Sequence, residues 1–536
     1  MSGGNMLSSF QDVTGGSEIS ADVCVVGAGA AGQTVAKALA DKGRNVLLLE
    51  SGGLDFDETV QQLNRAANTG VPYYDLYRAR LRFFGGTTAI WGGRTCRLDS
   101  IDFEKRPWVE HSGWPFGPEA LAPFYDLAEA RLGLISDYRS AHVLDRMHGI
   151  PELNRDEIDA SYWQFDHHID RFTAAYRDDV LKHPRITVMT GATVTEVVLH
   201  GDGNTVERLD VANLSGKRGS VKAKQYVIAC GGIENARLLL ASRSVRPAGV
   251  GNDTDWVGRS FMEHVHCRGG EIVADKPISA LAFGKSFRFH GSRFAAALRP
   301  GVPVQRSEGV LNASFTINVR KPPGRPMGAF MQGFNFMRHS MAVPNKFWRK
   351  SWYALKHTGT RFQEWIDPYR PWMLTKTSDR RIYAVVRSEQ APNRDSRVML
   401  NLDETDALGM PRAELHWALS EIDKRSVKST MLALDREFRR LGVGRVEPMA
   451  WLDDPANPWE FDPLISKNPI GGYHHMGTTR MAEPAEGVCD GDARVHGVDN
   501  LYMAGSSLFP TGGWANPTLT ILALSFKLAD HLSRKA

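Results

Sequence analysis

The chain has 536 residues, more than one hydrophobic core usually serves, so we expect two closely connected domains. Hydrophobic residues at 42% and charged residues at 24% are ordinary for a globular protein. The formal net charge of +4 is small for this length, which gives no reason to expect a nucleic-acid partner.

Five cysteines are scattered along the chain, and no two of them have metal-ligand or CxxC spacing. They are Cys24, Cys96, Cys230, Cys267 and Cys489. We therefore expect neither a metal site nor a disulfide framework, and we predict small buried side chains in a reducing compartment.

The first twenty residues lack the basic start and the apolar stretch of a signal peptide, and no apolar run is long enough to cross a membrane. We expect a cytoplasmic protein. Export together with a partner that carries its own signal stays open.

The first clear elements form a β–α–β unit. Asp22–Val26 and Val46–Leu49 are short apolar runs that predict buried strands, and Gln33–Lys42 has helical spacing. The turn between the first strand and the helix, Gly27–Gly32, has the sequence GAGAAG. Glu50 follows the second strand.

This context is the one that a GxGxxG motif requires for binding a dinucleotide. The first glycine makes a tight turn, the second lets the backbone approach a pyrophosphate, and the third lets the helix pack on the strand. The helix start offers free N–H groups to the phosphates, and a carboxylate after the second strand accepts hydrogen bonds from ribose hydroxyls. The residues expected at the dinucleotide are Gly27, Gly29, Ala30, Ala31, Gly32 and Glu50. The motif alone does not separate NAD from FAD.

A second glycine-rich segment, Phe84–Gly93, has the sequence FGGTTAIWGG. So many glycines around two hydroxyls and a tryptophan suit a backbone that lies against a planar ring or a phosphate. The candidate contacts in it are Gly86, Thr87, Ile90, Trp91 and Gly92.

The rest of the chain alternates between strands and helices. We predict strands at 186–189, 193–199, 205–212, 219–229, 381–387, 397–402 and 501–504. We predict helices at 233–241, at 420–441, and from Pro517 to the C-terminus, and Ser420 with Asp423 resembles a capping box. The two ends of the chain therefore build one nucleotide domain, and the middle inserts a second. The predicted ranges are 18–258 for the first part of the nucleotide domain, 259–460 for the inserted domain and 461–536 for the return.

The C-terminal motifs decide the cofactor. Gly471–Met481 contains HHMGTTRM, and Trp514–Thr520 has the sequence WANPTLT. Together with GAGAAG, the GGTTxxWGG loop and GGIENARLLLAS, in this order and spacing, they make the chain resemble the glucose–methanol–choline (GMC) family of flavoprotein oxidoreductases. The resemblance implies an α/β fold with a Rossmann-like FAD domain and a substrate domain, whose mixed or antiparallel sheet and flanking helices cover the flavin.

The resemblance also assigns roles to residues. His474 matches the active-site histidine of the family, and Asn516 matches its partner. Val194 matches the residue whose backbone contacts adenine, and Gly505 and Ser506 match the turn near the pyrophosphate and ribityl chain. His475 is predicted to lie in the pocket as a weaker substrate contact, and no metal is expected.

The chemistry agrees with these roles. Alcohol oxidation needs a base near the hydroxyl, a second group to orient it, and a hydride acceptor, which is flavin N5. Asn516 and Pro517 are typical of the N-cap and first position of a helix that continues with Thr518. The N–H groups of that helix would stabilise the negative charge of a reduced flavin. Among the other histidines, His264 and His266 have a minor chance of lining the substrate site.

The C-terminal block is most similar to sugar-oxidising members, among them pyranose oxidase, bacterial glycoside oxidases and bacterial sugar dehydrogenases. Ile90 stands where pyranose oxidase has a histidine joined to the flavin, so we predict non-covalent FAD. Glu234-Asn235 stands where many members have Ser-Pro, which puts the contacts of that turn in doubt.

The segment 328–374 is unusually aromatic and basic. We favour a lid over the substrate or a subunit interface, with membrane docking and a solvated local cluster as the alternatives.

The expected function is FAD-dependent oxidation of an alcohol, on a sugar or glycoside. The same chemistry on a benzylic or aliphatic alcohol is the alternative, and a redox-silent flavin-binding protein and an NAD-dependent dehydrogenase are remote ones. The electron acceptor, whether oxygen, a quinone or a cytochrome, and a homo-oligomeric state stay open.

Overall fold

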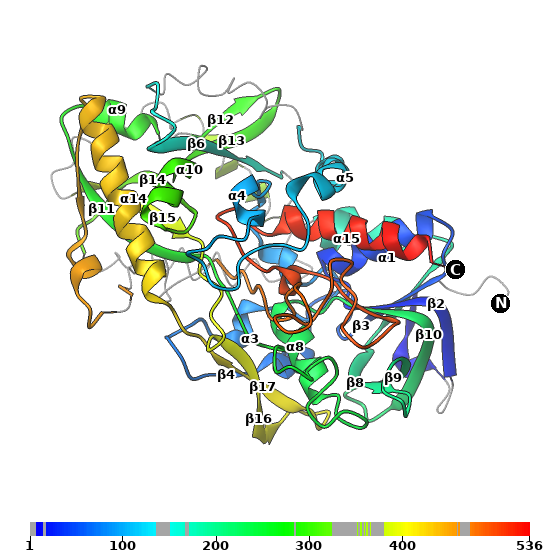
Figure 1. Ribbon diagram of the computed structural model, residues 1–536. Coiled ribbons are helices and arrows are strands. Elements are labelled where there is room, and N and C mark those ends of the chain that lie inside the picture. The colour runs from blue at the N-terminus through cyan, green and yellow to red at the C-terminus, as the bar shows by residue number, and fades with distance from the viewer. Residues whose placement is uncertain are drawn as a thin grey trace.

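The computed structural model describes residues 7–13, 18–135, 151–166, 171–283, 286–323, 380–457, 459–460 and 472–535, with a few short pieces between 351 and 365. The predicted insert 328–374 lies almost wholly outside these residues, as do Gly471, His167 and His168. Two large sheets organise the rest, one in each half of the molecule (Figure 1).

The first sheet has the strand order β1-β7-β3-β2-β10-β9-β8, with β19 beside β10. Its strands are β1 (Leu7–Ser9), β2 (Glu18–Val26), β3 (Val46–Glu50), β7 (Ile186–Thr190), β8 (Thr193–Leu199), β9 (Val206–Ala212), β10 (Arg218–Ile228) and β19 (Leu501–Met503). All pairs are parallel except those of β9 with β8 and β10. The central strand β3 is buried throughout, as the continuous apolar run predicts.

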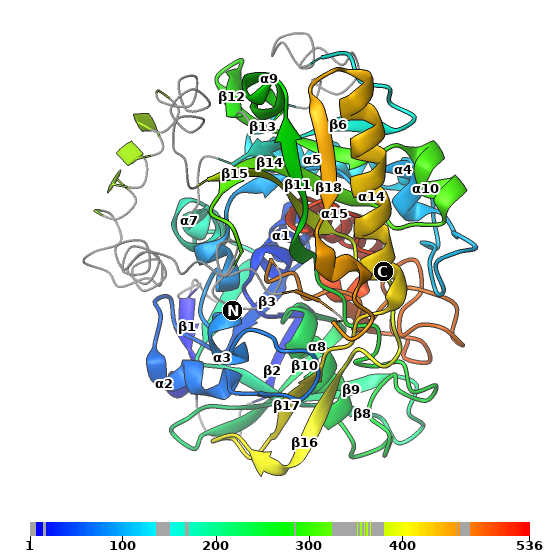
Figure 2. The same cartoon turned by 90° about the vertical axis from the view of Figure 1, so that its left-hand side faces the viewer.

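The second sheet is antiparallel and has the order β18-β11-β15-β14-β13-β6-β5, with β12 beside β13. Its strands are β5 (Arg94–Thr95), β6 (Ile158–Phe165), β11 (Val265–Ala274), β12 (Ser286–Phe289), β13 (Ser292–Pro300), β14 (Ala313–Arg320), β15 (Arg381–Ser388) and β18 (Gly444–Pro448). The long helix α14 (Glu421–Arg440) packs on one face of it, against β18, β11 and β15 (Figure 2). A parallel nucleotide sheet plus an antiparallel second sheet confirms the predicted fold class.

A small third sheet packs on helix α8 (Gly232–Ala241) of the nucleotide half. It pairs β16 (Arg397–Thr405) with β17 (Pro411–His416), and β17 with β4 (Ala67–Asn68). Segments of the two halves also interleave along the chain, because β5 and β6 fall within 18–258 and yet pair in the second sheet. The domain ranges drawn from the sequence stay a prediction.

The two ends of the chain meet in the nucleotide half. Helices α1 (Ala30–Asp41) and α15 (Thr518–Ser533) lie side by side, and α15 also packs on α5 (Ala122–Leu132) (Figure 1). Helix α8 (Gly232–Ala241) packs on β8 and β16. The shorter α-helices are α2 (Glu58–Gln61), α3 (Leu76–Ala79), α4 (Ser100–Phe103), α7 (Arg177–Leu181), α9 (Pro277–Ala282) and α10 (Val302–Glu308).

Most predicted elements are found within a few residues of their expected ends. The capping box of α14 is present, with Ser420 N–H donating to Asp423 Oδ2 at 2.7 Å. Helix α15 starts one residue later than predicted: Pro517 is its N-cap, because its carbonyl accepts the first helical bond from Ile521 N–H at 2.8 Å. Asn516 therefore lies just before the helix and is not its N-cap.

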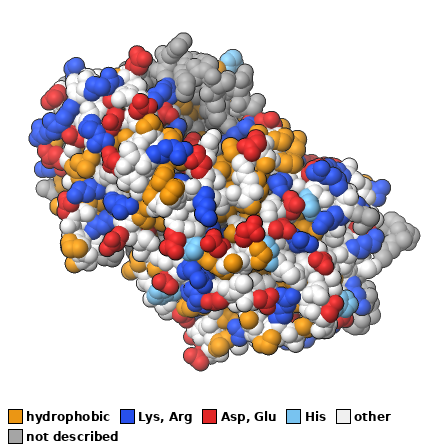
Figure 3. All heavy atoms as spheres, viewed as in Figure 1, with side chains coloured by type: hydrophobic (Ala, Val, Ile, Leu, Met, Phe, Trp, Pro, Cys, Tyr) orange, Lys and Arg blue, Asp and Glu red, His pale blue; other side chains and the backbone are white. Residues whose placement is uncertain are grey.

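Four of the five cysteines are buried and Cys230 is half-buried, with none of them in a disulfide. Among the helices that the structure describes, none combines the length and the apolar character needed to cross a bilayer. On the face shown in Figure 3, basic and acidic side chains are interspersed.

Candidate active site

The GAGAAG turn forms part of the wall of a groove. Gly27 adopts φ +98°, and a Cβ on it would lie 2.7 Å from Ala229 O. A Cβ on Gly32 would lie 1.8 Å from Gly27 O, so only glycine lets α1 pack this close to the strand. Gly29 is the N-cap of α1, and a Cβ there would meet nothing within 4 Å. The space in front of this helix start is therefore open, as a bound pyrophosphate requires.

We call this groove the cofactor groove, and its lining includes the glycine turn, Glu50 and the residues Gly85–Thr88. Of the predicted residues, those that line it are Gly27, Gly29, Ala30, Ala31, Glu50, Gly86, Thr87, Val194, His475, Gly505 and Ser506. Those outside the lining are Gly32, Ile90, Trp91, Gly92, His474, Asn516, Pro517 and Thr518.

Glu50 lies in the groove wall with both carboxylate oxygens oriented by backbone. Oε2 accepts from Ala28 N–H at 2.9 Å and Oε1 from Gly52 N–H at 2.8 Å. Burial raises the pKa of this carboxyl, and the two backbone donors oppose the rise. Each oxygen keeps a second lone pair, which fits the acceptor role toward ribose hydroxyls.

The FGGTTAIWGG loop lies against the first glycine turn. Gly85 N–H donates to Ala28 O at 2.9 Å, and a Cβ on Gly86 would lie 3.6 Å from Gly29 Cα. Gly86–Ile90 forms a 3₁₀ turn, and the ring of Trp91 packs edge-on against Phe172 outside the groove lining.

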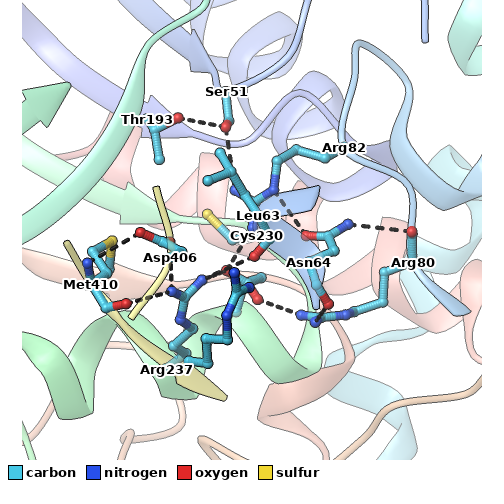
Figure 4. A network of polar contacts seen from close by, with 12 residues as sticks. Ser51, Leu63, Asn64, Arg80, Arg82, Thr193, Cys230, Arg237, Asp406 and Met410 are labelled. Carbon is cyan, nitrogen blue, oxygen red and sulfur yellow. Dashed lines mark hydrogen bonds and ion pairs between the residues drawn. The ribbon is translucent and has the colours of Figure 1, made fainter. Parts of the chain in front are cut away.

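The groove is also lined by a buried network that the sequence did not predict, which we call the arginine wall (Figure 4). At its centre Glu234 pairs with Arg80, with Arg82 at 2.7 Å and with Arg237 at 3.2 Å. Arg237 also pairs with Asp406 at 2.7 Å. Burial raises the pKa of the Glu234 carboxyl, but the charges of the three arginines outweigh it and hold this pKa far below its ordinary value.

The network draws in neutral groups as well. Arg82 donates to Asn64 Oδ1 at 2.8 Å and to Ser51 Oγ at 3.2 Å, and Ser51 Oγ lies 2.6 Å from Thr193 Oγ1 (Figure 4). Glu234, at the departure from the family pattern, is thus the centre of a wall in which distant segments of the chain meet at the groove.

His474 lies in the turn Gly472–Gly477, which we call the histidine turn. Tyr473 adopts φ +62°, a strained conformation for a tyrosine, and its ring stacks on Tyr74 at 4.2 Å. His475 lines the groove, and its carbonyl accepts from Ser506 Oγ at 2.7 Å. The histidine turn therefore borders the groove next to the turn at Gly505 and Ser506.

The structure brings His474 and Asn516 together, with Asn516 Nδ2 at 3.2 Å from His474 Nε2. On its other side His474 Nδ1 lies 2.7 Å from His264 Nδ1, and His264 Nε2 lies 2.7 Å from the carbonyl of Gly513. Both histidines have a lowered pKa, chiefly through burial, so they are neutral at pH 7.

This chain of contacts fixes the tautomer of His474. A carbonyl only accepts, so His264 Nε2 carries the proton and His264 Nδ1 is the acceptor. His474 Nδ1 must then donate, which leaves Nε2 unprotonated and facing Asn516. Neutral histidine in this tautomer is ready to take a proton at Nε2.

A buried carboxylate holds both histidines in place. Glu263 Oε1 accepts from His264 N–H at 2.9 Å and from His474 N–H at 2.8 Å, while Oε2 accepts from Tyr73 OH at 2.5 Å. Burial raises the pKa of Glu263, and the hydrogen bond from Tyr73 and those from the backbone oppose this.

The carbonyl that orients His264 lies in a constrained loop. Gly513 adopts φ +53°, and a Cβ on it would lie 2.4 Å from Asp102 Oδ2. Next to it Trp514 donates to Asp99 Oδ2 at 2.7 Å, and Trp114 donates to Thr511 Oγ1 at 2.9 Å. These two hydrogen bonds fix the loop from residue 511 to Asn516 to the neighbouring segments of the chain.

The sequence predicted His474, Asn516 and the groove residues, and it missed Glu263, the arginine wall and the role of His264. The only local signal for Glu263 was its place beside His264. The arginine wall gave none, since its charged members are up to 326 residues apart by number and meet only in the fold.

A family model described as FAD dependent oxidoreductase matches residues 22–250, and one described as GMC oxidoreductase matches residues 392–525. The chain belongs to the GMC family of FAD-dependent oxidoreductases. Like other members, this enzyme oxidises CH–OH groups with FAD as cofactor.

Its relatives act on different alcohols. The enzyme is 24% identical to the 6'''-hydroxyparomomycin C oxidase of Streptomyces lividus, over 96% of this chain and 92% of that one. It is 24% identical to the 2-methyl-1,2-propanediol dehydrogenase of Mycolicibacterium austroafricanum, over 96% and 95%. The structure of a fungal aryl-alcohol oxidase superposes with a TM-score of 0.55 at 15% identity, over 96% of this chain and 99% of that one, which shows a shared fold.

The groove fits FAD. It offers an open helix start at Gly29, an acidic acceptor at Glu50, and a second glycine turn at Gly505, where a Cβ would meet nothing within 4 Å.

Proposed function

We propose that the enzyme oxidises a hydroxyl of a sugar or glycoside, with His474 as the base and Asn516 as the group that orients the hydroxyl. The observation that carries the proposal is the contact chain from Gly513 through His264, which leaves the unprotonated Nε2 of His474 beside Asn516 Nδ2. An alcohol oxygen between the two side chains would accept from Nδ2 and give its proton to Nε2.

FAD, when bound, supplies the hydride acceptor. The start of α15 directly follows Asn516, so its free N–H groups favour negative charge on the same side as the orienting amide. Burial lowers the pKa of His474, so the imidazole is unprotonated before the substrate arrives.

A sugar substrate is supported by the name of the Streptomyces relative, an oxidase of 6'''-hydroxyparomomycin C, and by the C-terminal motifs. A non-sugar alcohol is the second candidate, because the Mycolicibacterium relative is named for 2-methyl-1,2-propanediol. A panel of sugars, glycosides, diols and benzylic alcohols, mixed anaerobically with the enzyme, separates the two by which class bleaches the flavin.

His474→Ala tests the base. We expect flavin reduction to slow by about 10²- to 10⁴-fold while FAD content is unchanged, since general-base catalysis contributes that much. His200→Ala, at an exposed position, is the matched control and should reduce at the normal rate. A His474→Ala enzyme with full FAD and nearly full turnover would refute the assignment.

Non-covalent FAD is also part of the proposal. Ile90 offers no nucleophile to the flavin, so denaturation should release all of the yellow colour into the supernatant. Colour that stays with the precipitated protein would contradict it. The electron acceptor is left open between oxygen, a quinone and a cytochrome, and the cytoplasmic location stays a prediction.

A further inference from the structure

One face of the second sheet carries a row of cations beside the histidine turn. Opposite residues of an antiparallel pair point to the same face. The register places His266 opposite Arg387, and Arg387 opposite Ser314. Towards the far edge of the sheet it places Phe165 opposite Arg94. We call this the basic face. Its basic members are Arg94, His266, Arg268, Arg293, Arg299, Arg320, Arg381 and Arg387.

The two faces of the sheet differ in what they meet. Phe315, Val386 and Cys267 alternate with the basic residues and are fully buried on the side where α14 packs. The basic face is turned the other way, because His264, two residues before His266, contacts His474 and Gly513.

Tryptophans connect Arg387 to the Asn516 loop. The guanidinium of Arg387 lies 5.4 Å from the ring centre of Trp163, and Trp163 packs edge-on against Trp514 with ring centres 5.6 Å apart. Trp514 is two residues before Asn516. The positive charge of Arg387 is also close enough to lower the pKa of His474.

Arg387 is half-buried, and its surroundings differ from those of a buried arginine that has a carboxylate partner. Its Nη1 is buried and has no hydrogen-bond partner among the described residues. Burial, and then the positive charges of Arg94 and Arg320, lower the pKa of Arg387 to about 9. By contrast, the fully buried Arg106 has both terminal nitrogens on Glu389, at 2.6 and 2.8 Å.

A guanidinium held in a protein interior is costly unless an anion meets it. We propose that Arg387 binds a carboxylate or phosphate carried by the alcohol substrate, so that the substrate is an anionic alcohol, such as a sugar acid or sugar phosphate. This rests on the proposed function, since it places the anion beside the hydroxyl that His474 and Asn516 engage. A planar guanidinium matches either anion with two parallel hydrogen bonds, which would also orient the substrate.

The test compares three matched compounds, D-glucose, D-glucuronate and D-glucose 6-phosphate, by calorimetric titration of the oxidised FAD-loaded enzyme. We expect one of the charged compounds to bind more tightly than glucose. Arg387→Gln should weaken that binding by about 10- to 100-fold and leave glucose unaffected, since a hydrogen bond to a charged group contributes that much. Arg387→Lys, which keeps the charge, should restore part of it.

Arg381→Gln is the control, because Arg381 lies on the same strand but is exposed and pairs with Glu271. It should bind all three compounds as the unchanged enzyme does. Equal or absent binding of all three compounds, or an equal loss for glucose and the charged compounds in Arg387→Gln, would overturn the inference.

The titration needs no turnover, so it separates this inference from the proposed function. His474→Ala should still bind the charged compound. If a charged compound binds tightly but no alcohol bleaches the flavin, the proposed function is wrong and the anion site is not. If neutral sugars bleach the flavin rapidly and Arg387→Gln leaves that rate unchanged, the anion site is wrong and the proposed function is not.

Discussion

The arginines of the cofactor groove and Arg387 of the basic face differ in how their buried positive charge is compensated. In the groove wall, Arg80, Arg82 and Arg237 surround Glu234, and Asp406 adds a second carboxylate. On the basic face, Arg387 has positive neighbours and a buried nitrogen without a partner in the described chain. In the arginine wall the positive charges are compensated by carboxylates of the protein itself. The unpaired nitrogen of Arg387 is instead available to an anionic ligand.

Glu234→Gln should have the largest effect on stability. It leaves three buried arginines with one carboxylate, and breaking a buried ion pair costs about 3–5 kcal/mol. We expect the free energy of unfolding in urea to fall by that amount and FAD to be lost on dilution, because the wall lines the groove. Glu104→Gln is the matched control, since Glu104 pairs with Arg306 at the surface and should cost under about 1 kcal/mol. Equal losses in the two variants would remove the distinction between the clusters.

His264→Leu should slow flavin reduction by about 100-fold, the lower part of the general-base range, because His474 Nδ1 loses its acceptor and the imidazole can adopt the wrong tautomer. His264→Gln offers an acceptor again and should recover part of the rate. Stopped-flow absorbance measures both, with FAD content and KM as checks on a purely structural effect. If His264→Leu raised KM and left the limiting rate unchanged, His264 would only shape the pocket.

Arg387→Gln should change stability little. No described carboxylate is left unpaired by it, so the free energy of unfolding should stay within about 1 kcal/mol of the original or rise. Urea unfolding, run beside Glu234→Gln, gives the contrast directly. A loss of more than about 2 kcal/mol would mean that Arg387 has a structural partner after all.

The smallest expected effect is a shift in pH dependence. Burial, and then repulsion from Arg387 and from His264, His266 and His475 when these are protonated, hold the pKa of His474 well below its usual value. The base is neutral above that pKa, so the rate of flavin reduction should be flat near neutrality and fall only in acid. Removing the charge in Arg387→Gln makes protonation easier, so the acid limb should move to higher pH. An acid limb that stays in place would show that Arg387 does not act on His474.

Local structure could be predicted from the sequence where the residues of one short stretch are enough to determine it. The strand, glycine turn and helix around Gly27 follow from φ requirements and close packing, and the cap of α14 follows from Ser420 and Asp423. In the second sheet, β11, β13 and β14 were not predicted as strands. Strand β14 does alternate apolar and polar residues, whereas β11 is interrupted by Gly269-Gly270, where its register shifts.

By itself, then, the sequence determined the nucleotide-binding unit, the family and the pair His474 and Asn516, because motifs of adjacent residues carry these. Only the tertiary structure decided what surrounds that pair. His264 lies 210 residues from His474 along the chain, and Arg387 reaches the same region through pairing of strands β11 and β15. Such contacts depend on how distant strands register in a sheet, and that register is set by packing of the whole molecule rather than by any local run of residues.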